Sequence, residues 1–339
     1  MTSERIVAIA LGDPAGVGPE IAMKTALDQR VRESCRTVLF GDRRAIDTHI
    51  AACGLRFPYR VYDSVAEVQW SSSGVPLIHV ESLPEGVRLG QVEGAHGAAA
   101  IAALNAAVAA ALAGEVSAVV GGPIHEVAIR QAGIHFDGHP SFLARRTGTP
   151  VDEVFLMLCY GSKRIVHATL HVSVREALAM LTRERVAKAI HTCDRALRKL
   201  GCDAPRIGVS GVNPHAGEAG LFGTDEIEVI APAIADARAA GIDVIGPVGA
   251  DTLLAQDDCD AFIVMLHDQG HVAAKLAAPH TVAALSIGTP VIFSSVGHGT
   301  AMDIAGKNMA HPEAMIQAVF QVANASAHRI NQQNKGDKR

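Results

Sequence analysis

Short apolar runs alternate with longer amphipathic stretches along the chain, and this pattern predicts strands that alternate with helices. The helices are expected at residues 21–27, from about residue 43, at 174–181 and at 226–240. The strands are expected at residues 6–11, 37–40, 118–120, 164–170, 206–212, 261–266 and 290–294. Such alternation predicts an α/β fold in which helices cover both faces of a largely parallel sheet.

Three of the expected strands end in a histidine followed by polar, turn-forming residues. His171 closes ATLH, His215 lies within NPHAGE, and His267 opens HDQG. Sheets of this kind bind ligands beyond the carboxyl ends of their strands, so the three imidazoles are candidate ligands of one divalent metal. Zinc suits such a set best, and three ligands leave a position open for a substrate oxygen. Asp251 and Asp268 are either carboxylates that orient a ligating ring or plain turn residues.

Two glycine-rich loops are candidate cofactor sites. GDPAGVGPE at 12–20 joins the first strand to the first helix, and GHGTAMDIAG at 297–306 follows a short strand. Neither is a dinucleotide fingerprint or a phosphate loop. For each loop the sequence supports two interpretations equally. The glycines either contact a cofactor or only allow the backbone to turn.

Composition narrows the class of protein. With 339 residues, 49% of them hydrophobic and only 4% aromatic, the chain is large enough for two domains with aliphatic cores. A net charge of −5 gives no electrostatic reason to expect nucleic acid or an anionic membrane as a partner. A serine hydrolase is poorly supported, because no GxSxG elbow is present.

The cysteines and one alanine-rich segment bear on where the protein works. The six cysteines form no CxxC pair and no secretory signal is evident, so reduced thiols in the cytoplasm are expected. Residues 94–114 are almost uncharged, but alanine contributes too little hydrophobicity for membrane insertion, and Asn105 argues further against it. We expect a buried helix whose small residues allow close backbone approach.

Several ordered motifs resemble the 4-hydroxythreonine-4-phosphate dehydrogenase (PdxA) family of vitamin B6 synthesis. The match runs from about residue 6 to 320 and is carried by GDPAGVGPE, the Gly138-His139 pair, ATLH, NPHAGE with LFGTDEIE, GADTLL, HDQG with Lys275, and SVGHGTAMDIAGK. The resemblance implies two α/β/α domains like those of isopropylmalate dehydrogenase, with mostly parallel sheets and a cleft between the domains. One domain would comprise residues 1–125 with about 280–339 and carry the cofactor loops. The other, about 126–279, would bind metal and substrate and form the dimer.

The same resemblance implies a cofactor and a site. It implies an oxidation that depends on NAD or NADP and is followed by loss of CO2, with His171, His215 and His267 as metal ligands. It also implies a homodimer whose metal site draws ligands from both subunits. The residues implied to contact the nicotinamide cofactor are Gly12, Asp13, Gly16, Gly18, His298, Gly299, Thr300, Ala301 and Asp303.

Three departures from the family pattern concern the substrate. Members that use a phosphorylated substrate have threonine, asparagine and arginine where this chain has Pro140, Ala284 and Phe293, whereas Lys275 is kept. Proline, alanine and phenylalanine replace neither the hydrogen bonds nor the charge that hold a phosphate, and the loss is worth several kcal/mol. The pocket is therefore expected to be more apolar.

The chain resembles most the branch of the family that includes terephthalate cis-dihydrodiol dehydrogenase. This implies aromatic catabolism, in which a carboxylated cyclohexadiene diol is oxidised and decarboxylated to protocatechuate. His139 or Asp268 would take the hydroxyl proton, with the choice between them open. Lys275 would anchor a carboxylate or protonate the enolate. His125 and His271 would meet a remote carboxylate or serve the structure.

Two other functions remain open from the sequence. One is the oxidation of 4-phosphohydroxy-L-threonine or a related 4-phospho-hydroxyacid. The other is a metalloprotein without redox activity, such as a lyase, on the same fold. The sequence leaves the native metal open and does not separate NAD from NADP.

Overall fold

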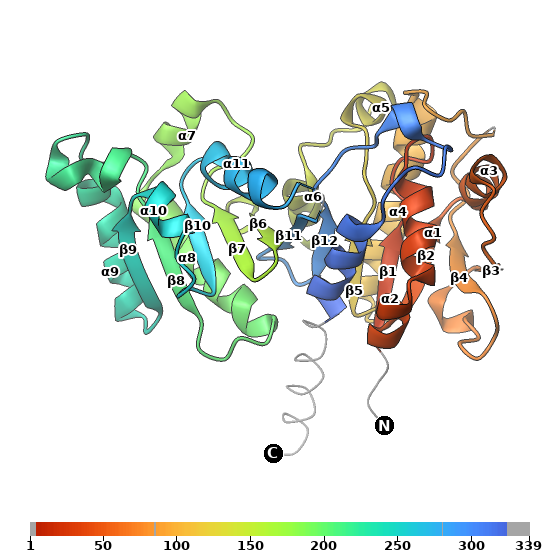
Figure 1. Cartoon of the computed structure of the whole chain (residues 1–339), viewed down its shortest axis with the longest axis horizontal. Coiled ribbons are helices and arrows are strands. Elements are labelled where there is room, and N and C mark those ends of the chain that lie inside the picture. Colours follow the sequence, from red (N-terminus) through yellow and green to blue (C-terminus); the bar gives the residue numbers. More distant parts are fainter. Residues whose placement is uncertain (1–4, 85, 280, 324–339) are drawn as a thin grey trace, which may run out of the picture. The chain divides into compact units, whose positions relative to one another are not determined.

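The computed structural model describes residues 5–84, 86–279 and 281–323, and the chain divides into two compact units (Figure 1). Unit 1 contains the described residues up to Phe142 together with those from Pro290 onward, and unit 2 runs from Leu143 to Thr289. The sequence placed the domain boundaries near residues 125 and 280. Residues 126–142 were expected in the central domain but belong to unit 1. Residues 281–289 were expected in the domain with the cofactor loops but belong to unit 2.

The described strands of unit 1 form a parallel sheet in the order β3-β4-β2-β1-β5-β12. Their bounds are β1 Ile6–Ala10, β2 Arg36–Gly41, β3 Tyr59–Tyr62, β4 Val75–His79, β5 Ala118–Gly121 and β12 Phe293–Val296. β1 and β5 are completely apolar apart from glycine and almost fully buried, as strands covered on both faces are.

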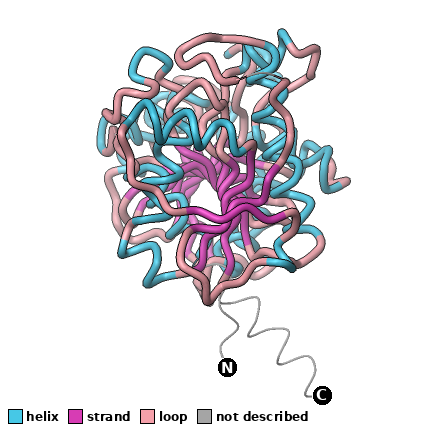
Figure 2. Tube along the Cα trace, turned by 90° about the vertical axis from the view of Figure 1, so that its right-hand side faces the viewer, coloured by secondary structure: helices cyan, strands magenta, loops and turns pink. Residues whose placement is uncertain are grey.

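The helices of unit 1 surround this sheet. The labelled helices are α1 Gly18–Leu27, α2 Gln29–Ser34, α3 Arg43–Cys53, α4 Gly94–Leu112, α5 Glu126–Gln131 and α6 His139–Thr147, which continues into unit 2. Residues 313–323 are also helical. Asp42 caps α3 by accepting a hydrogen bond from the backbone N–H of Arg44, and Gly54 ends it in the left-handed conformation. Figure 2 shows the strands in the interior, with helices and loops outside them.

The described strands of unit 2 form a mixed sheet in the order β11-β6-β7-β10-β8-β9. β7, β10, β8 and β9 are parallel, whereas β6 runs antiparallel to both β7 and β11. Their bounds are β6 Phe155–Tyr160, β7 Lys163–His167, β8 Arg206–Ser210, β9 Asp243–Val248, β10 Ala261–Val264 and β11 Ala283–Ile287. The predicted α/β fold with mostly parallel sheets is confirmed, with one antiparallel strand in its interior.

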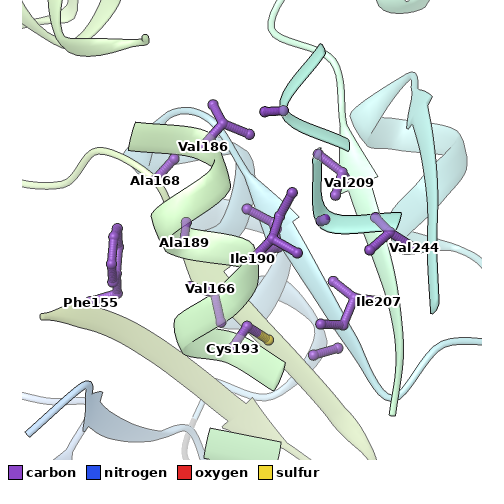
Figure 3. Close-up of a cluster of buried hydrophobic side chains, with 14 of the residues drawn as sticks. Phe155, Val166, Ala168, Val186, Ala189, Ile190, Cys193, Ile207, Val209 and Val244 are labelled. Atoms are coloured by element: carbon purple, nitrogen blue, oxygen red, sulfur yellow. The ribbon is translucent and has the colours of Figure 1, made fainter. Parts of the chain in front are cut away.

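Side chains of alternate strand residues face opposite layers of helices in unit 2. Met157, Val166 and Leu285 join the core formed with α8 Arg183–Lys199 and α9 Ala231–Ala239 (Figure 3). Their neighbours Leu158 and Ala284 face the other way and pack with α11 His267–Ala277. The remaining helices are α7 Val174–Met180 and α10 Ala250–Leu254.

Helix α4 is long and apolar enough to cross a membrane by length and composition, but more than half of its most apolar window is buried inside the protein. It packs on β1, β2 and β5 and lies against α5. A Cβ on Gly97 would lie 2.3 Å from the carbonyl carbon of Ala128 and 2.4 Å from the backbone nitrogen of Ile129. The expected close backbone approach is therefore present, and α4 is a core helix.

Replacing Gly97 with alanine tests this packing. Alanine normally stabilises a helix by up to about 1 kcal/mol relative to glycine. Here the added methyl group would meet the backbone of α5, so we expect a net loss of about 1–3 kcal/mol in the free energy of unfolding. Denaturant titration measures it, with Ala109→Leu at an exposed position of the same helix as the control. A stabilised Gly97→Ala protein would show that α4 and α5 have room to separate.

Candidate functional site

His215 lies in a run of left-handed backbone. Five consecutive residues from His215 to Ala219 have φ between 42° and 79°, and only Gly217 among them is a glycine. Each non-glycine residue in this conformation costs roughly 1 kcal/mol, so a tertiary contact has to hold the turn. The His215 ring is exposed and meets Phe222 edge-on, with the ring centroids 5.9 Å apart.

The buried carboxylate of Glu226 supplies that contact. Its Oε1 accepts hydrogen bonds from the backbone N–H groups of Val212 and Asn213, each at 2.8 Å, and its Oε2 accepts one from Asn213 Nδ2 at 3.0 Å. A Cβ on Gly217 would lie 2.7 Å from Oε2, so glycine lets the turn close on the carboxylate. Glu226 starts a single π-helical turn, Glu226–Ile230, a geometry found often at functional sites.

His267 is the first residue of α11, and its ring lies next to that of His171. Their ring centroids are 5.6 Å apart. The Nδ1 atom of His267 lies 2.7 Å from Asp268 Oδ1, and because a carboxylate accepts, Nδ1–H donates. The Nε2 atom of His267 then carries a lone pair that is available to a metal.

Two further histidines join this pair. The ring of His271 stacks on that of His267 at 3.8 Å, and its Nδ1 lies 3.1 Å from Nε2 of the buried His167. Burial lowers the pKa of His167 to about 3 and that of His271 to about 4, and the neighbouring imidazoles act in the same direction. The sequence did not indicate that His167 and His271 contact each other, because they lie 104 positions apart, on β7 and on α11.

His215 does not join the other two expected ligands within one chain. Among the described residues, the ring nitrogens of His171, His215 and His267 do not all lie within 4.8 Å of one another. Asp251 lies on the His215 side, because a Cβ on Gly249 would be 2.9 Å from its Oδ1 and 3.7 Å from the Cα atom of His215. The chain thus presents two histidines together and one apart.

Glu20, His49 and Cys53 do bring their ligand atoms within 4.8 Å of one another, and all three are buried in unit 1. The Cys53 thiol donates to Glu20 Oε2, while Glu20 Oε1 accepts from Lys24 Nζ and from the backbone N–H of Ala310. Burial raises the pKa of the Cys53 thiol and lowers that of His49. The thiol and the carboxylate therefore already satisfy each other, and we regard the cluster as structural.

The two glycine-rich loops meet in unit 1. The backbone N–H of Val17 donates to the carbonyl of Thr300 at 2.9 Å, and a Cβ on Gly16 would lie 2.8 Å from the Thr300 Cβ. Gly12 has φ +75°, and a Cβ on Gly18 would lie only 2.1 Å from the Leu11 carbonyl oxygen. The glycines are thus required by close packing between the loops and the strand ends.

Asp13 is a buried carboxyl group at the centre of these loops. Its Oδ1 accepts from the Ala15 N–H at 2.9 Å, whereas Oδ2 is buried with no hydrogen-bond partner in the described part of the chain. Burial raises its pKa, and the nearby His96 and His125 act against that rise. His96 was not anticipated from the sequence.

The rest of the second loop is more open. His298 and Gly299 are exposed, and no atom lies within 4 Å of a Cβ built on Gly299. Ala301 adopts a left-handed conformation with φ 42°, and Asp303 is exposed in the short 3-10 turn Met302–Ile304.

The substrate residues expected in unit 1 gather around Phe293. Phe293 is 1% exposed, and its ring centroid lies 5.2 Å from that of His139. The His139 Nε2 atom is buried with no hydrogen-bond partner among the described residues, and burial lowers its pKa to about 4. Pro140 follows in the first turn of α6 and is half-buried.

The substrate residues expected in unit 2 lie on or against α11. Lys275 is exposed in the last turn of this helix, and Ala284 is 8% exposed in the apolar cluster packed under it. Asp268 is exposed beside His267. The predicted site residues thus fall into two sets, one in each unit.

Comparison with known proteins identifies the family. The family described as pyridoxal phosphate biosynthetic protein PdxA matches residues 33–322. The chain belongs to the PdxA family. It is 41% identical over 317 residues to the 1,2-dihydroxy-3,5-cyclohexadiene-1,4-dicarboxylate dehydrogenase of a Comamonas species, across 93% of this chain and 96% of that protein.

Solved structures of this family agree. A terephthalate 1,2-cis-dihydrodiol dehydrogenase from Burkholderia xenovorans is 42% identical, with a TM-score of 0.68 over 94% of this chain and 98% of that one. A 4-hydroxythreonine-4-phosphate dehydrogenase from Klebsiella pneumoniae is 36% identical, with a TM-score of 0.86 over 96% and 100% of the two chains. The predicted resemblance is confirmed, and the chain is a dehydrogenase of the PdxA family.

Replacing Glu226 with alanine should release the His215 turn. The variant leaves two backbone N–H groups without their acceptor and removes one of the two acceptors of the Asn213 amide, so we expect a loss of about 2–4 kcal/mol in unfolding free energy. Differential scanning calorimetry and denaturant titration measure it. Glu228→Ala, exposed two residues further on, should change stability by less than about 0.5 kcal/mol. Equal effects of the two substitutions would refute the anchoring role.

Proposed function

We propose that this chain oxidises a carboxylated cis-dihydrodiol, of the terephthalate-dihydrodiol type, with NAD or NADP and a divalent metal, and that the oxidised product loses CO2. The burial of Phe293 is the observation that carries this proposal. An arginine at this position would have to place a guanidinium where the ring now packs on His139 and against Gly121. An apolar wall suits a cyclohexadiene ring and offers a phosphate dianion no partner.

The named relatives support the same substrate class. Two proteins that are 41% and 42% identical to this chain are named for cyclohexadiene diol or terephthalate dihydrodiol oxidation. The Klebsiella structure, named for a phosphorylated substrate, is 36% identical. Phosphohydroxy-acid oxidation is therefore the second candidate, with Lys275 as its remaining anion partner.

The donor set suits a divalent metal held by His171, His267 and His215. Imidazole nitrogens favour zinc among the common divalent ions. A bound metal would supply Lewis-acid polarisation of the substrate hydroxyl and stabilisation of the enolate that forms when CO2 leaves. The Asp268 carboxylate orients the His267 ring through Nδ1, and we assign the same role toward His215 to Asp251, which lies near the His215 backbone.

The joined glycine loops of unit 1 are the proposed nicotinamide dinucleotide site. The cofactor supplies the hydride acceptor when bound. Gly12, Gly16 and Gly18 hold the first loop against the strand ends, and the exposed His298, Gly299 and Asp303 are open to a ligand. The half-satisfied Asp13 carboxyl, with Oδ2 unpartnered among the described residues, fits a ligand hydroxyl or amide donor.

Proton transfer is assigned to this chain's own side chains. Asp268 is engaged by His267, which favours the orienting role for it and leaves His139 as the proposed acceptor of the hydroxyl proton. The lowered pKa keeps the His139 ring neutral at pH 7, so one of its two ring nitrogens has a lone pair that can accept the proton. Lys275 would hold a substrate carboxylate or return a proton to the enolate.

We also propose a homodimer in which the metal site takes His171 and His267 from one subunit and His215 from the other. The separation of His215 from the other two within one chain supports this arrangement. All six cysteines are free thiols, which suits the reducing cytoplasm as the proposed location.

A substrate comparison tests the proposed activity. Purified protein with zinc and either NAD or NADP should turn over cis-1,2-dihydroxycyclohexa-3,5-diene-1,4-dicarboxylate with a kcat/KM roughly 100-fold or more above that for 4-phosphohydroxy-L-threonine. Reduced cofactor is followed at 340 nm and CO2 release separately. The opposite preference would establish the phosphorylated substrate. Metal binding without any cofactor reduction on either substrate would indicate a non-redox metalloprotein.

Subunit mixing tests the shared metal site. His215→Ala and His267→Ala should each lose activity and most of the bound zinc, whereas His135→Ala, at an exposed position, should retain both. If the ligands come from two subunits, refolded mixtures of the two inactive variants regain about a quarter of wild-type activity, because half the dimers hold one intact site. Absence of any recovery, with heterodimers verified by mass spectrometry, would contradict the shared site.

A further inference from the structure

One face of α11 carries three polar side chains at a spacing of four residues. His267, His271 and Lys275 follow one another at helical intervals, which place them along the same side of the helix. The stacking of His271 on His267 at 3.8 Å agrees with this placement. His271 therefore lies between a proposed metal ligand and the proposed anchor of a substrate carboxylate.

The tautomers of His167 and His271 follow from two backbone carbonyls. The Nδ1 atom of His167 lies 3.5 Å from the carbonyl oxygen of Leu156, and the Nδ1 atom of His271 lies 3.3 Å from that of His267. A carbonyl oxygen only accepts, so each Nδ1 has to carry the hydrogen when the ring is neutral. The Nε2 atom of His167 is then a lone pair and accepts from Nδ1–H of His271, at 3.1 Å.

Hydrogen bonds thus connect the Leu156 carbonyl on β6, His167 on β7 and His271 on α11. The last atom of this series is Nε2 of His271. Both Nδ1–H groups point back into the protein, and Nε2 of His271 is left with a lone pair and no hydrogen-bond partner in the described part of the chain. Gly270 makes the approach possible, because a Cβ there would lie 2.4 Å from His167 Nε2. We propose that His271, oriented by His167, accepts a hydrogen bond through Nε2 from the second hydroxyl of the vicinal diol substrate.

This inference rests on the proposed function and specifies how the diol is recognised. In a cis-dihydrodiol carboxylate one hydroxyl is oxidised, and its neighbour stays on the ring and needs an acceptor. A neutral imidazole lone pair accepts from O–H and cannot pair with a carboxylate or a phosphate oxygen. The His271 position therefore selects a substrate with two adjacent hydroxyls, whereas Lys275 four residues further on meets the anionic end.

Binding of stable saturated ligands in the absence of NAD and NADP measures this contact without turnover, because hydride then has no acceptor. The dissociation constants of cis-1,2-dihydroxycyclohexane-1,4-dicarboxylate and of its analogue without the 1-hydroxyl are compared for wild type and for His271→Leu. Wild type should prefer the diol about tenfold or more, and His271→Leu should bind the two ligands equally. His271→Gln, which can place an oxygen near the position of Nε2, should restore most of the preference. An unchanged preference in His271→Leu overturns the proposal.

Metal affinity separates this role from direct metal ligation. Zinc dissociation constants from chelator competition should stay within about threefold of wild type for His271→Leu, since metal ligands lose far more on removal. A large loss of zinc affinity would make His271 a ligand and overturn the proposal. If wild type itself binds neither saturated ligand, the proposed function fails together with this inference. If it binds both with equal affinity, only the inference fails.

The tautomers give a second test, which is read on the wild-type protein and uses variants only to assign the signals. Nitrogen-15 NMR of histidine-labelled wild-type protein distinguishes Nδ1–H from Nε2–H rings by chemical shift and by couplings to the ring carbons. His167 and His271 should both be Nδ1–H tautomers at neutral pH. An Nε2–H tautomer at His271 would leave no lone pair for the hydroxyl and would overturn the proposal. Assignment uses His167→Leu and His271→Gln spectra.

Discussion

In unit 2, the alternation of side chains along β6, β7 and β11 determines both which residues form the core and which residues face the proposed site on α11. One set of side chains, including Met157 and Val166, fills the core under α8 and α9. The intervening set faces α11 and includes Leu158, Ala284 and His167. A slip of one residue in register would exchange the two sets and place the imidazole in the aliphatic core. The apolar packing on one face therefore determines which polar groups reach the other.

A second constraint is the backbone strain at His215. Left-handed residues are tolerated there because Glu226 binds the two N–H groups that precede the turn. The carboxylate is buried and accepts from three donors, so its charge is compensated without a cation. The exposed His215 side chain is consequently carried on a rigid turn rather than on a mobile loop. Strain of this kind is retained where a side chain has to be presented in one direction.

Apolar runs predicted β1, β2, β5, β7, β8, β10 and β12 to within a few residues, since each is a continuous buried stretch. They did not predict β3, β4, β6, β9 and β11. β3 and β9 lack a continuous buried run, β4 is interrupted by Pro76, and β6 belongs to a tight hairpin that turns at Gly161. β11 is apolar and fully buried, so burial does not explain why it was missed. The glycine loops and strand-end histidines were found from local sequence. Glu226 and the His167–His271 pair were not, because their roles arise from contacts between segments far apart in the chain.

The proposed role of Phe293 in specificity is inseparable from its packing. A Cβ on Gly121 would lie 2.9 Å from the end of the Phe293 ring and 3.4 Å from His139 Nε2, so these three residues fill one space together. Restoring an arginine alone would bury a guanidinium without an acceptor and open a gap beside the imidazole. Conversion to a phosphate-binding pocket would thus require changes at several of these positions together. The proposed substrate preference therefore rests on core packing in unit 1, and single substitutions there should damage folding before they change the substrate.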